Sequence, residues 1–102
     1  MKFKLKGIQK SLNDVIRTIG YQASYFQGEG EVSVVRHINR RDYPRFHLYI
    51  TQEEDGLRCN LHLDQKKPSY QGSRGHSGEY EGSVVEEEVK RIQDLLQKTP
   101  SV

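Results

Sequence analysis

A chain of 102 residues can form one domain but not two. Its single cysteine excludes an intramolecular disulfide and a zinc site built from several cysteines. The net charge is only +2, but residues 1–51 hold nine Lys/Arg and four Asp/Glu, whereas residues 52–102 hold seven and ten. This asymmetry is compatible with binding a small anionic ligand at one end of the molecule.

The composition also predicts a cytoplasmic protein without membrane association. A lone cysteine suits a reducing compartment, and residues 1–10 are basic but lack the apolar stretch of a signal peptide. No apolar run approaches the roughly 20 residues that span a bilayer. We expect a single domain over residues 1–98 and a disordered C-terminal tail over residues 99–102.

The first quarter of the chain contains two regular patterns. Residues 2–6, KFKLK, alternate lysine with apolar residues and predict a short edge strand. Residues 11–19 carry apolar side chains at helical spacing, with Ser11 and Asp14 as a capping pair and Gly20 as a stop signal. The sequence from residue 21 to residue 28 alternates only weakly, so it leaves open whether this segment forms a strand.

The middle of the chain predicts three further strands, at residues 31–39, 45–52 and 57–64. Asp55-Gly56 separates the last two and is a typical two-residue hairpin turn. The segment that follows, residues 65–82, contains four glycines. Long loops of this kind in small domains are usually functional or disordered.

A second helix is predicted at residues 83–98, where Ser83 and Glu86 match a capping box. The element order is therefore strand, helix, four strands, helix. Each helix has one apolar stripe, so the simplest packing puts both on one face of a mostly antiparallel sheet. The predicted fold class is a two-layer α+β domain.

Strand alternation divides the side chains between the two faces of this sheet. The apolar set would face the helices and consists of Phe46, Leu48, Ile50, Leu57, Cys59, Leu61 and Leu63. The opposite, polar face would carry Arg45, His47, Tyr49, Thr51, Arg58, Asn60, His62 and Asp64. His47 and His62 should therefore project on the same side, and Cys59 should be a buried thiol on the other.

The hairpin turn also predicts cross-strand partners. A two-residue turn at Asp55-Gly56 pairs Tyr49 with His62 and His47 with Asp64; a three-residue loop would shift these partners. In the preceding strand Val32, Val34 and Ile38 form the more apolar set, although Arg36 is a misfit in it. This pattern favours a position for His37 on the polar face. His37 would lie opposite His47 if residues 39 and 45 pair.

The polar face is our leading candidate for a site that binds a small ligand, an anion or a divalent metal, with hydrolysis as one chemistry it would support. His47 and His62 are the candidate acid–base residues, with Asp64 as the orienting carboxylate. The loop would close over them. The candidate ligand-binding residues are His37, Arg45, Tyr49, Lys67, Tyr70 and Arg74. A metal such as zinc, iron or manganese would be held by His47, His62, His76 and Glu79.

Two other classes of function remain open. Arginines interleaved with aromatic residues can hold single-stranded nucleic acid by charge and stacking, and this alternative uses Arg40, Arg41, Tyr43 and Arg45. The low net charge and the lack of an RNP-like motif weigh against it. A non-enzymatic interaction domain or homodimer is the other class, since an edge strand or exposed tyrosines would suit an interface.

Overall fold

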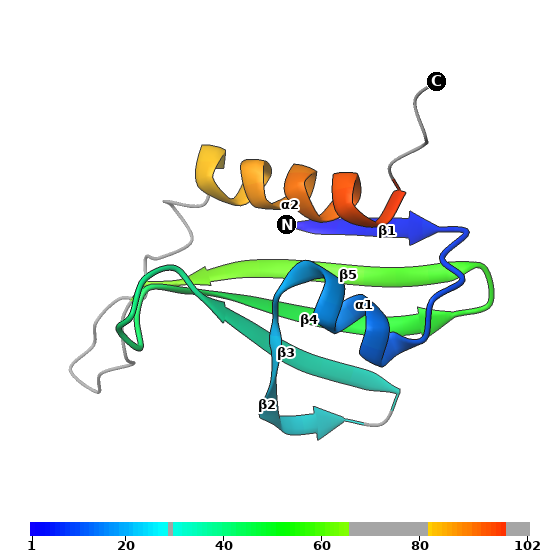
Figure 1. Ribbon diagram of the computed structural model, residues 1–102, viewed down its shortest axis with the longest axis horizontal. Helices are drawn as coiled ribbons and strands as arrows, with labels where there is room; N and C mark the ends of the chain where they lie inside the picture. Colours follow the sequence, from blue (N-terminus) through cyan, green and yellow to red (C-terminus); the bar gives the residue numbers. More distant parts are fainter. Residues whose placement is uncertain (29, 66–81, 98–102) are drawn as a thin grey trace.

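The structure, a computed structural model, describes residues 1–28, 30–65 and 82–97, with only the backbone of residues 25–28. Its elements follow the predicted order: β1 (Lys2–Lys6), α1 (Leu12–Ile19), β2 (Gln22–Gly28), β3 (Glu31–His37), β4 (Arg45–Glu53), β5 (Gly56–Asp64) and α2 (Gly82–Gln97). The strands form one antiparallel sheet in the order β1-β5-β4-β3-β2. Both helices pack on one face of it, which confirms the predicted two-layer α+β fold (Figure 1).

Helix α1 begins and ends where its sequence signals predict. The Ser11 hydroxyl accepts a hydrogen bond from the Asp14 backbone N–H at 3.1 Å. Gly20 takes a left-handed conformation with φ of 83°, and its N–H donates to the carbonyl of Arg17. Helix α2 differs from the prediction because it begins at Gly82, so Ser83 lies inside the helix and is not its cap.

The core lies between the sheet and the helices. Its completely buried side chains come from four strands and both helices and include Leu5, Val15, Ile19, Val34, Leu48, Ile50, Cys59, Leu61, Val85 and Ile92. Cys59 is 1% exposed, and burial raises the pKa of its thiol to about 12. This confirms the expectation of a buried cysteine on the helix side.

The β4–β5 hairpin turns one residue earlier than predicted. Glu53 pairs with Gly56, so the two turn residues are Glu54 and Asp55. Gly56 is needed for a different reason, because a Cβ atom there would overlap the carbonyl oxygen of Leu5 in the neighbouring strand β1. The glycine thus serves the close approach of β1 and is not a turn residue.

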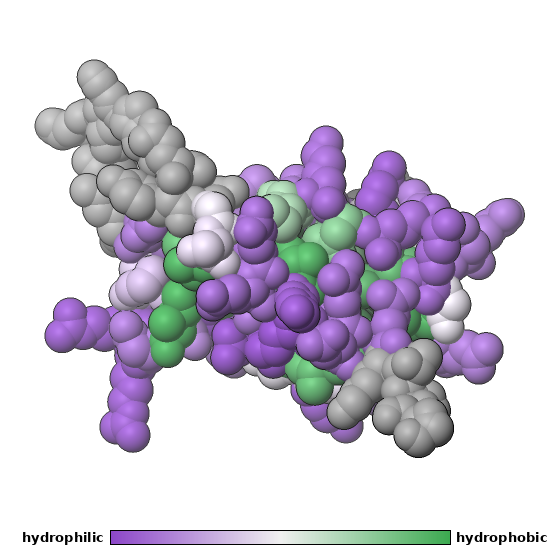
Figure 2. All heavy atoms as spheres, turned by 90° about the horizontal axis from the view of Figure 1, so that it is seen from above, coloured by the Kyte–Doolittle hydropathy of each residue, from purple (hydrophilic) through white to green (hydrophobic). Residues whose placement is uncertain are grey.

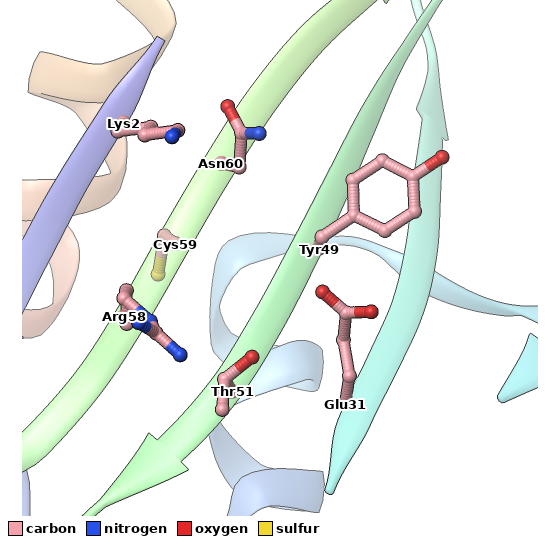
Figure 3. Close-up of a pocket in the computed structure, with 7 residues that line it drawn as sticks. All are labelled: Lys2, Glu31, Tyr49, Thr51, Arg58, Cys59 and Asn60. Atoms are coloured by element: carbon pink, nitrogen blue, oxygen red, sulfur yellow. The ribbon is translucent and has the colours of Figure 1, made fainter. Parts of the chain in front are cut away.

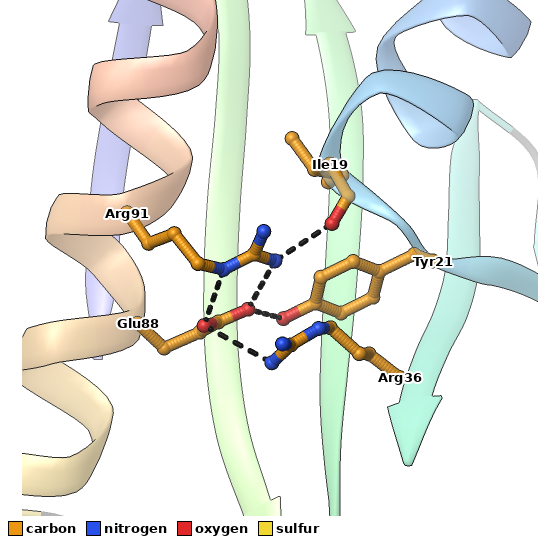
Figure 4. A network of polar contacts seen from close by, with 5 residues as sticks. All are labelled: Ile19, Tyr21, Arg36, Glu88 and Arg91. Carbon is orange, nitrogen blue, oxygen red and sulfur yellow. Dashed lines mark hydrogen bonds and ion pairs between the residues drawn. The ribbon is translucent and has the colours of Figure 1, made fainter. Parts of the chain in front are cut away.

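A buried carboxylate links α2 to the rest of the domain (Figure 4). Glu88 is 4% exposed and accepts hydrogen bonds from the Tyr21 hydroxyl at 2.6 Å and from Arg91 at 2.8 Å. Arg36 also reaches this carboxylate, at 3.4 Å, and Arg91 donates to the carbonyl of Ile19 at 2.6 Å. The network explains why an arginine occupies a helix-facing position in β3.

The surface that carries α2 is mostly hydrophilic, and its hydrophobic atoms lie in small separate areas (Figure 2). Val84 and Leu95 of this helix are each 43% exposed. Within the part of the chain that the structure describes, no helix has the length and apolar character needed to cross a membrane.

Candidate functional site on the polar face of the sheet

The face of the sheet that points away from the helices carries the predicted polar residues. Along β4 and β5, buried side chains alternate with partly exposed ones, and the buried set is apolar. His47 and His62 are direct cross-strand partners and therefore share a face. The central prediction of strand parity is confirmed. We refer below to this side of the sheet as the polar face.

The individual partners on the polar face differ from those predicted. His47 pairs with His62 and not with Asp64, and Tyr49 pairs with Asn60 and not with His62. The cause is the turn at Glu54-Asp55, which moves the partners by two residues and so leaves every side chain on its predicted face. Asp64 is directly opposite Arg45 instead.

His47 lies at the centre of this face, and both of its ring nitrogens are engaged. Nδ1 is 3.2 Å from Asp64 Oδ2, so the predicted contact with Asp64 forms along the diagonal of the ladder. Nε2 is 2.6 Å from the Ser33 hydroxyl oxygen. The ring stacks on Tyr49 with 4.5 Å between ring centroids, and the side chain is 17% exposed. These contacts fix the position and the orientation of the imidazole.

Asp64 is held as a carboxylate by two basic neighbours. The hydrogen bond from His47 lowers the pKa of Asp64 below its ordinary value, and Arg45, whose Nε lies 3.3 Å from Oδ2, adds to the shift. A carboxylate only accepts hydrogen bonds, so the His47 Nδ1–H is the donor in their contact. When the ring is neutral, Nε2 is therefore the unprotonated nitrogen and can accept a hydrogen bond.

His62 and His37 extend the polar face on either side of His47. The His62 and Tyr49 rings make a T-shaped contact, with 5.8 Å between centroids. His37 pairs with Arg45, whereas Val35 lies opposite His47, so the predicted His37–His47 pairing is wrong. The β3–β4 ladder starts from a longer turn than assumed, and His37 Nδ1 lies 3.2 Å from the carbonyl of Asp42 in that turn. His37 is therefore on the predicted face but at its margin.

A hollow of about 200 Å³ lies on the polar face beside Tyr49 (Figure 3). In this view both helices are behind the sheet, as expected for the face that points away from them. Two rows of cross-strand partners supply its lining, which consists of Lys2, Glu31, Tyr49, Thr51, Arg58 and Asn60, together with the backbone position of Cys59. Burial raises the pKa of Tyr49, so its hydroxyl stays protonated and can donate to a ligand.

The predicted metal set is not assembled by the residues that the structure describes. No group of three or more His, Cys, Asp or Glu side chains within residues 1–28, 30–65 and 82–97 is arranged to hold a metal ion. Ligation through His47 would also have to displace Ser33 or Asp64 from a ring nitrogen. The other candidates from the long loop, Lys67, Tyr70, Arg74, His76 and Glu79, lie outside the described residues, as does the tail at 99–102.

The residues of the nucleic-acid alternative are in and beside the β3–β4 turn. Arg40 and Arg41 are exposed there. Tyr43 is half-buried, and its ring is covered by the Arg45 guanidinium at 4.7 Å from the centroid. Arg45 in turn contacts Asp64, so two of the four predicted residues are engaged with each other or with the polar face.

The sequence patterns place Asn60 on the polar face but do not mark it as a site residue, and they do not mark Ser33, Ser24 or Lys2. Ser33 shares the parity of His37 in β3, but only the observed register brings its hydroxyl to His47. The pairing of β2 with β3 brings Ser24 close to Ser33, and their hydroxyl oxygens are 2.9 Å apart. Parity in β1 and β5 was the available signal for Lys2 and Asn60, which are direct partners.

Comparisons of the chain with protein-family models, with curated proteins and with solved structures found no match. The class that the fold defines is thus a small α+β domain with one polar and one helix-covered face of its sheet.

Proposed function

We propose that the hollow on the polar face binds a small anionic ligand. The observation that carries this proposal is the placement of two cationic side chains, Lys2 and Arg58, on one side of the hollow (Figure 3). An ammonium and a guanidinium at one rim suit a carboxylate or phosphate group, and the guanidinium can bind such a group in bidentate fashion. Asn60 and Thr51 also line the hollow and add hydrogen-bond donors.

The opposite rim restricts the ligand further. Glu31 lies there, and its carboxylate would repel a ligand that is anionic throughout. A ligand with a hydroxyl or amino group at a distance from its anionic group would instead donate to Glu31 and accept from Lys2. The Arg58 guanidinium already forms an ion pair with Glu53, with 3.3 Å between Nε and Oε2. Lys2 is therefore the principal cation for the ligand.

The size of the hollow limits the ligand to a small molecule. Pockets that hold drug-sized ligands have volumes of roughly 300–1,000 Å³, whereas this one has about 200 Å³. A small hydroxy acid, amino acid or phosphate monoester fits this volume. Larger polymers would contact the hollow only through one such group.

The test is a titration followed by amide NMR, with glycerol phosphate as the ligand and inorganic phosphate for comparison. We expect shifts at Lys2, Glu31, Thr51, Arg58 and Asn60, and tighter binding of glycerol phosphate. Lys2→Gln should weaken binding by about tenfold, the loss of one charge-assisted contact of about 1.4 kcal/mol. The matched control is Lys90→Gln, since Lys90 is an exposed lysine on α2. Equal weakening by both variants, or shifts confined to other surfaces, would contradict the proposal.

A further inference from the structure

A continuous chain of side-chain contacts crosses four strands and is not used by the proposed anion site. The Ser24 hydroxyl lies 2.9 Å from the Ser33 hydroxyl, which lies 2.6 Å from His47 Nε2. On its other side, His47 Nδ1 contacts Asp64, and Arg45 contacts the same carboxylate oxygen. Each of β2, β3, β4 and β5 thus contributes one member to a line of polar groups that ends on an anchored carboxylate.

The direction of the protons along this chain follows from the donors available. Because the Asp64 carboxylate accepts from Nδ1–H, the neutral His47 ring has its lone pair on Nε2. Ser33 then donates its single hydroxyl proton to Nε2. Ser24 in turn donates its hydroxyl proton to the Ser33 oxygen. Both serine hydroxyls in this row of contacts therefore have a hydrogen-bond partner. This is the arrangement in which a serine, a histidine and an aspartate activate a hydroxyl for nucleophilic attack.

We propose that Ser33 is a nucleophile that accepts an acyl group from small esters, with His47 as general base and Asp64 as the residue that orients the imidazole. The Ser33 oxygen attacks the ester carbonyl carbon while its proton moves to His47 Nε2. When the tetrahedral intermediate collapses, the bond from carbon to the leaving oxygen breaks, and His47 returns the proton to that oxygen. Water then attacks the acyl carbon and gives a proton to His47 Nε2. The bond from carbon to the Ser33 oxygen breaks, His47 returns the proton to that oxygen, and the carboxylic acid is released.

Access to Ser33 decides which substrates can react. Ser33 is 2% exposed, and the hollow is lined by its cross-strand partner Tyr49 and not by Ser33 itself. The Tyr49 ring is also stacked on His47. Attack therefore requires the Tyr49 side chain to move, and only esters with a small acyl group can enter from the hollow. Removing the Tyr49 ring should therefore raise the rate at which Ser33 is acylated. The same substitution would not raise the rate of an exposed nucleophile.

The experiment treats the full chain with p-nitrophenyl acetate and locates acetyl groups by peptide mass spectrometry. We expect acetylation of Ser33 and a rate that falls about 100-fold in His47→Ala, the size of a general-base contribution. Tyr49→Ala should react faster than the unmodified chain. Ser83→Ala is the control, because Ser83 is an exposed serine on α2 that takes no part in the contacts between Ser24, Ser33, His47 and Asp64. Surface lysines also react, but independently of His47.

Two outcomes would overturn the proposal. One is the absence of a Ser33 adduct in both the unmodified chain and Tyr49→Ala; the other is a Ser33 adduct whose rate His47→Ala does not change. Amide NMR spectra establish that each variant is folded, and His47→Gln replaces His47→Ala if the latter is not. Glycerol phosphate binding measured in Ser33→Ala separates this proposal from the anion site, because that site does not involve the Ser33 hydroxyl.

Discussion

At the scale of single residues, His47 is the most constrained polar side chain of the candidate site. A serine, an aspartate and a tyrosine ring hold it from three directions. A histidine on an ordinary solvated sheet face needs none of these contacts. The hydrogen bond to Asp64 has a consequence for stability, because it shifts the proton affinity of that carboxyl group in the folded state.

The pKa of Asp64 lies below its ordinary value of 3.8 in the folded protein. A depressed carboxyl pKa stabilises the fold above the unfolded-state pKa, and this contribution is lost as the pH falls through the folded-state pKa. Asp64→Asn should therefore lower the free energy of unfolding by about 1 kcal/mol at neutral pH. The difference from the unmodified chain should shrink in the acid range, below about pH 4.

Thermal unfolding of both chains across this pH range measures the effect. Glu54→Gln is the control, since Glu54 is an exposed acid in the β4–β5 turn, and we expect a change within about 0.5 kcal/mol. A stability difference for Asp64→Asn that stays constant from neutral to acid pH would show that the carboxylate is not held as described.

Residue identity alone predicted part of this arrangement. His47 and Asp64 stand out in the sequence, and parity placed them on one face, which the structure confirms. Ser33 could not be ranked above other serines, because its importance depends on a register set by the length of the β3–β4 turn. A shift of two residues keeps a side chain on its face but changes its neighbour. Contacts across strands are therefore harder to predict than faces.

At the scale of elements, the attachment of α2 depends on Glu88. Its buried carboxylate accepts hydrogen bonds from the Tyr21 hydroxyl, just before β2, and from the Arg91 guanidinium in the next turn of the helix. Burial and the hydrogen bond to Glu88 both raise the pKa of Tyr21, so the phenol remains a donor. In the sequence, Glu88 lies among three consecutive glutamates, and nothing distinguishes it from its neighbours except its place beside the apolar stripe.

Glu88→Ala should lower the free energy of unfolding by about 2–3 kcal/mol. The substitution leaves the buried Tyr21 hydroxyl without its acceptor, while Arg91 is partly exposed and can be solvated. Urea unfolding measures the loss. The matched control is Glu87→Ala, an exposed glutamate one position earlier in the same helix. Equal effects of the two substitutions would contradict an anchoring role for Glu88.

At the scale of the whole molecule, the sequence predicted the layers because hydrophobic pattern determines them. The apolar sets of β4 and β5 and the stripes of both helices have only one way to be buried together, and the core contains them. Arg36 broke this pattern for a reason that only the tertiary structure shows, namely Glu88 on α2. The hollow is lined by residues of β3, β4 and β5 and by Lys2 of β1. The sequence of any one segment therefore does not predict it.

The proposal that Ser33 is a nucleophile has one requirement across the strands of the sheet: His47 must be a fixed ring with its proton on Nδ1. Long-range nitrogen–proton NMR of the ring, recorded at about pH 8, reports which nitrogen is protonated. We predict a single tautomer with the proton on Nδ1 and the unprotonated Nε2 accepting a hydrogen bond from Ser33. A ring protonated on Nε2, or one that averages between both tautomers, would contradict it.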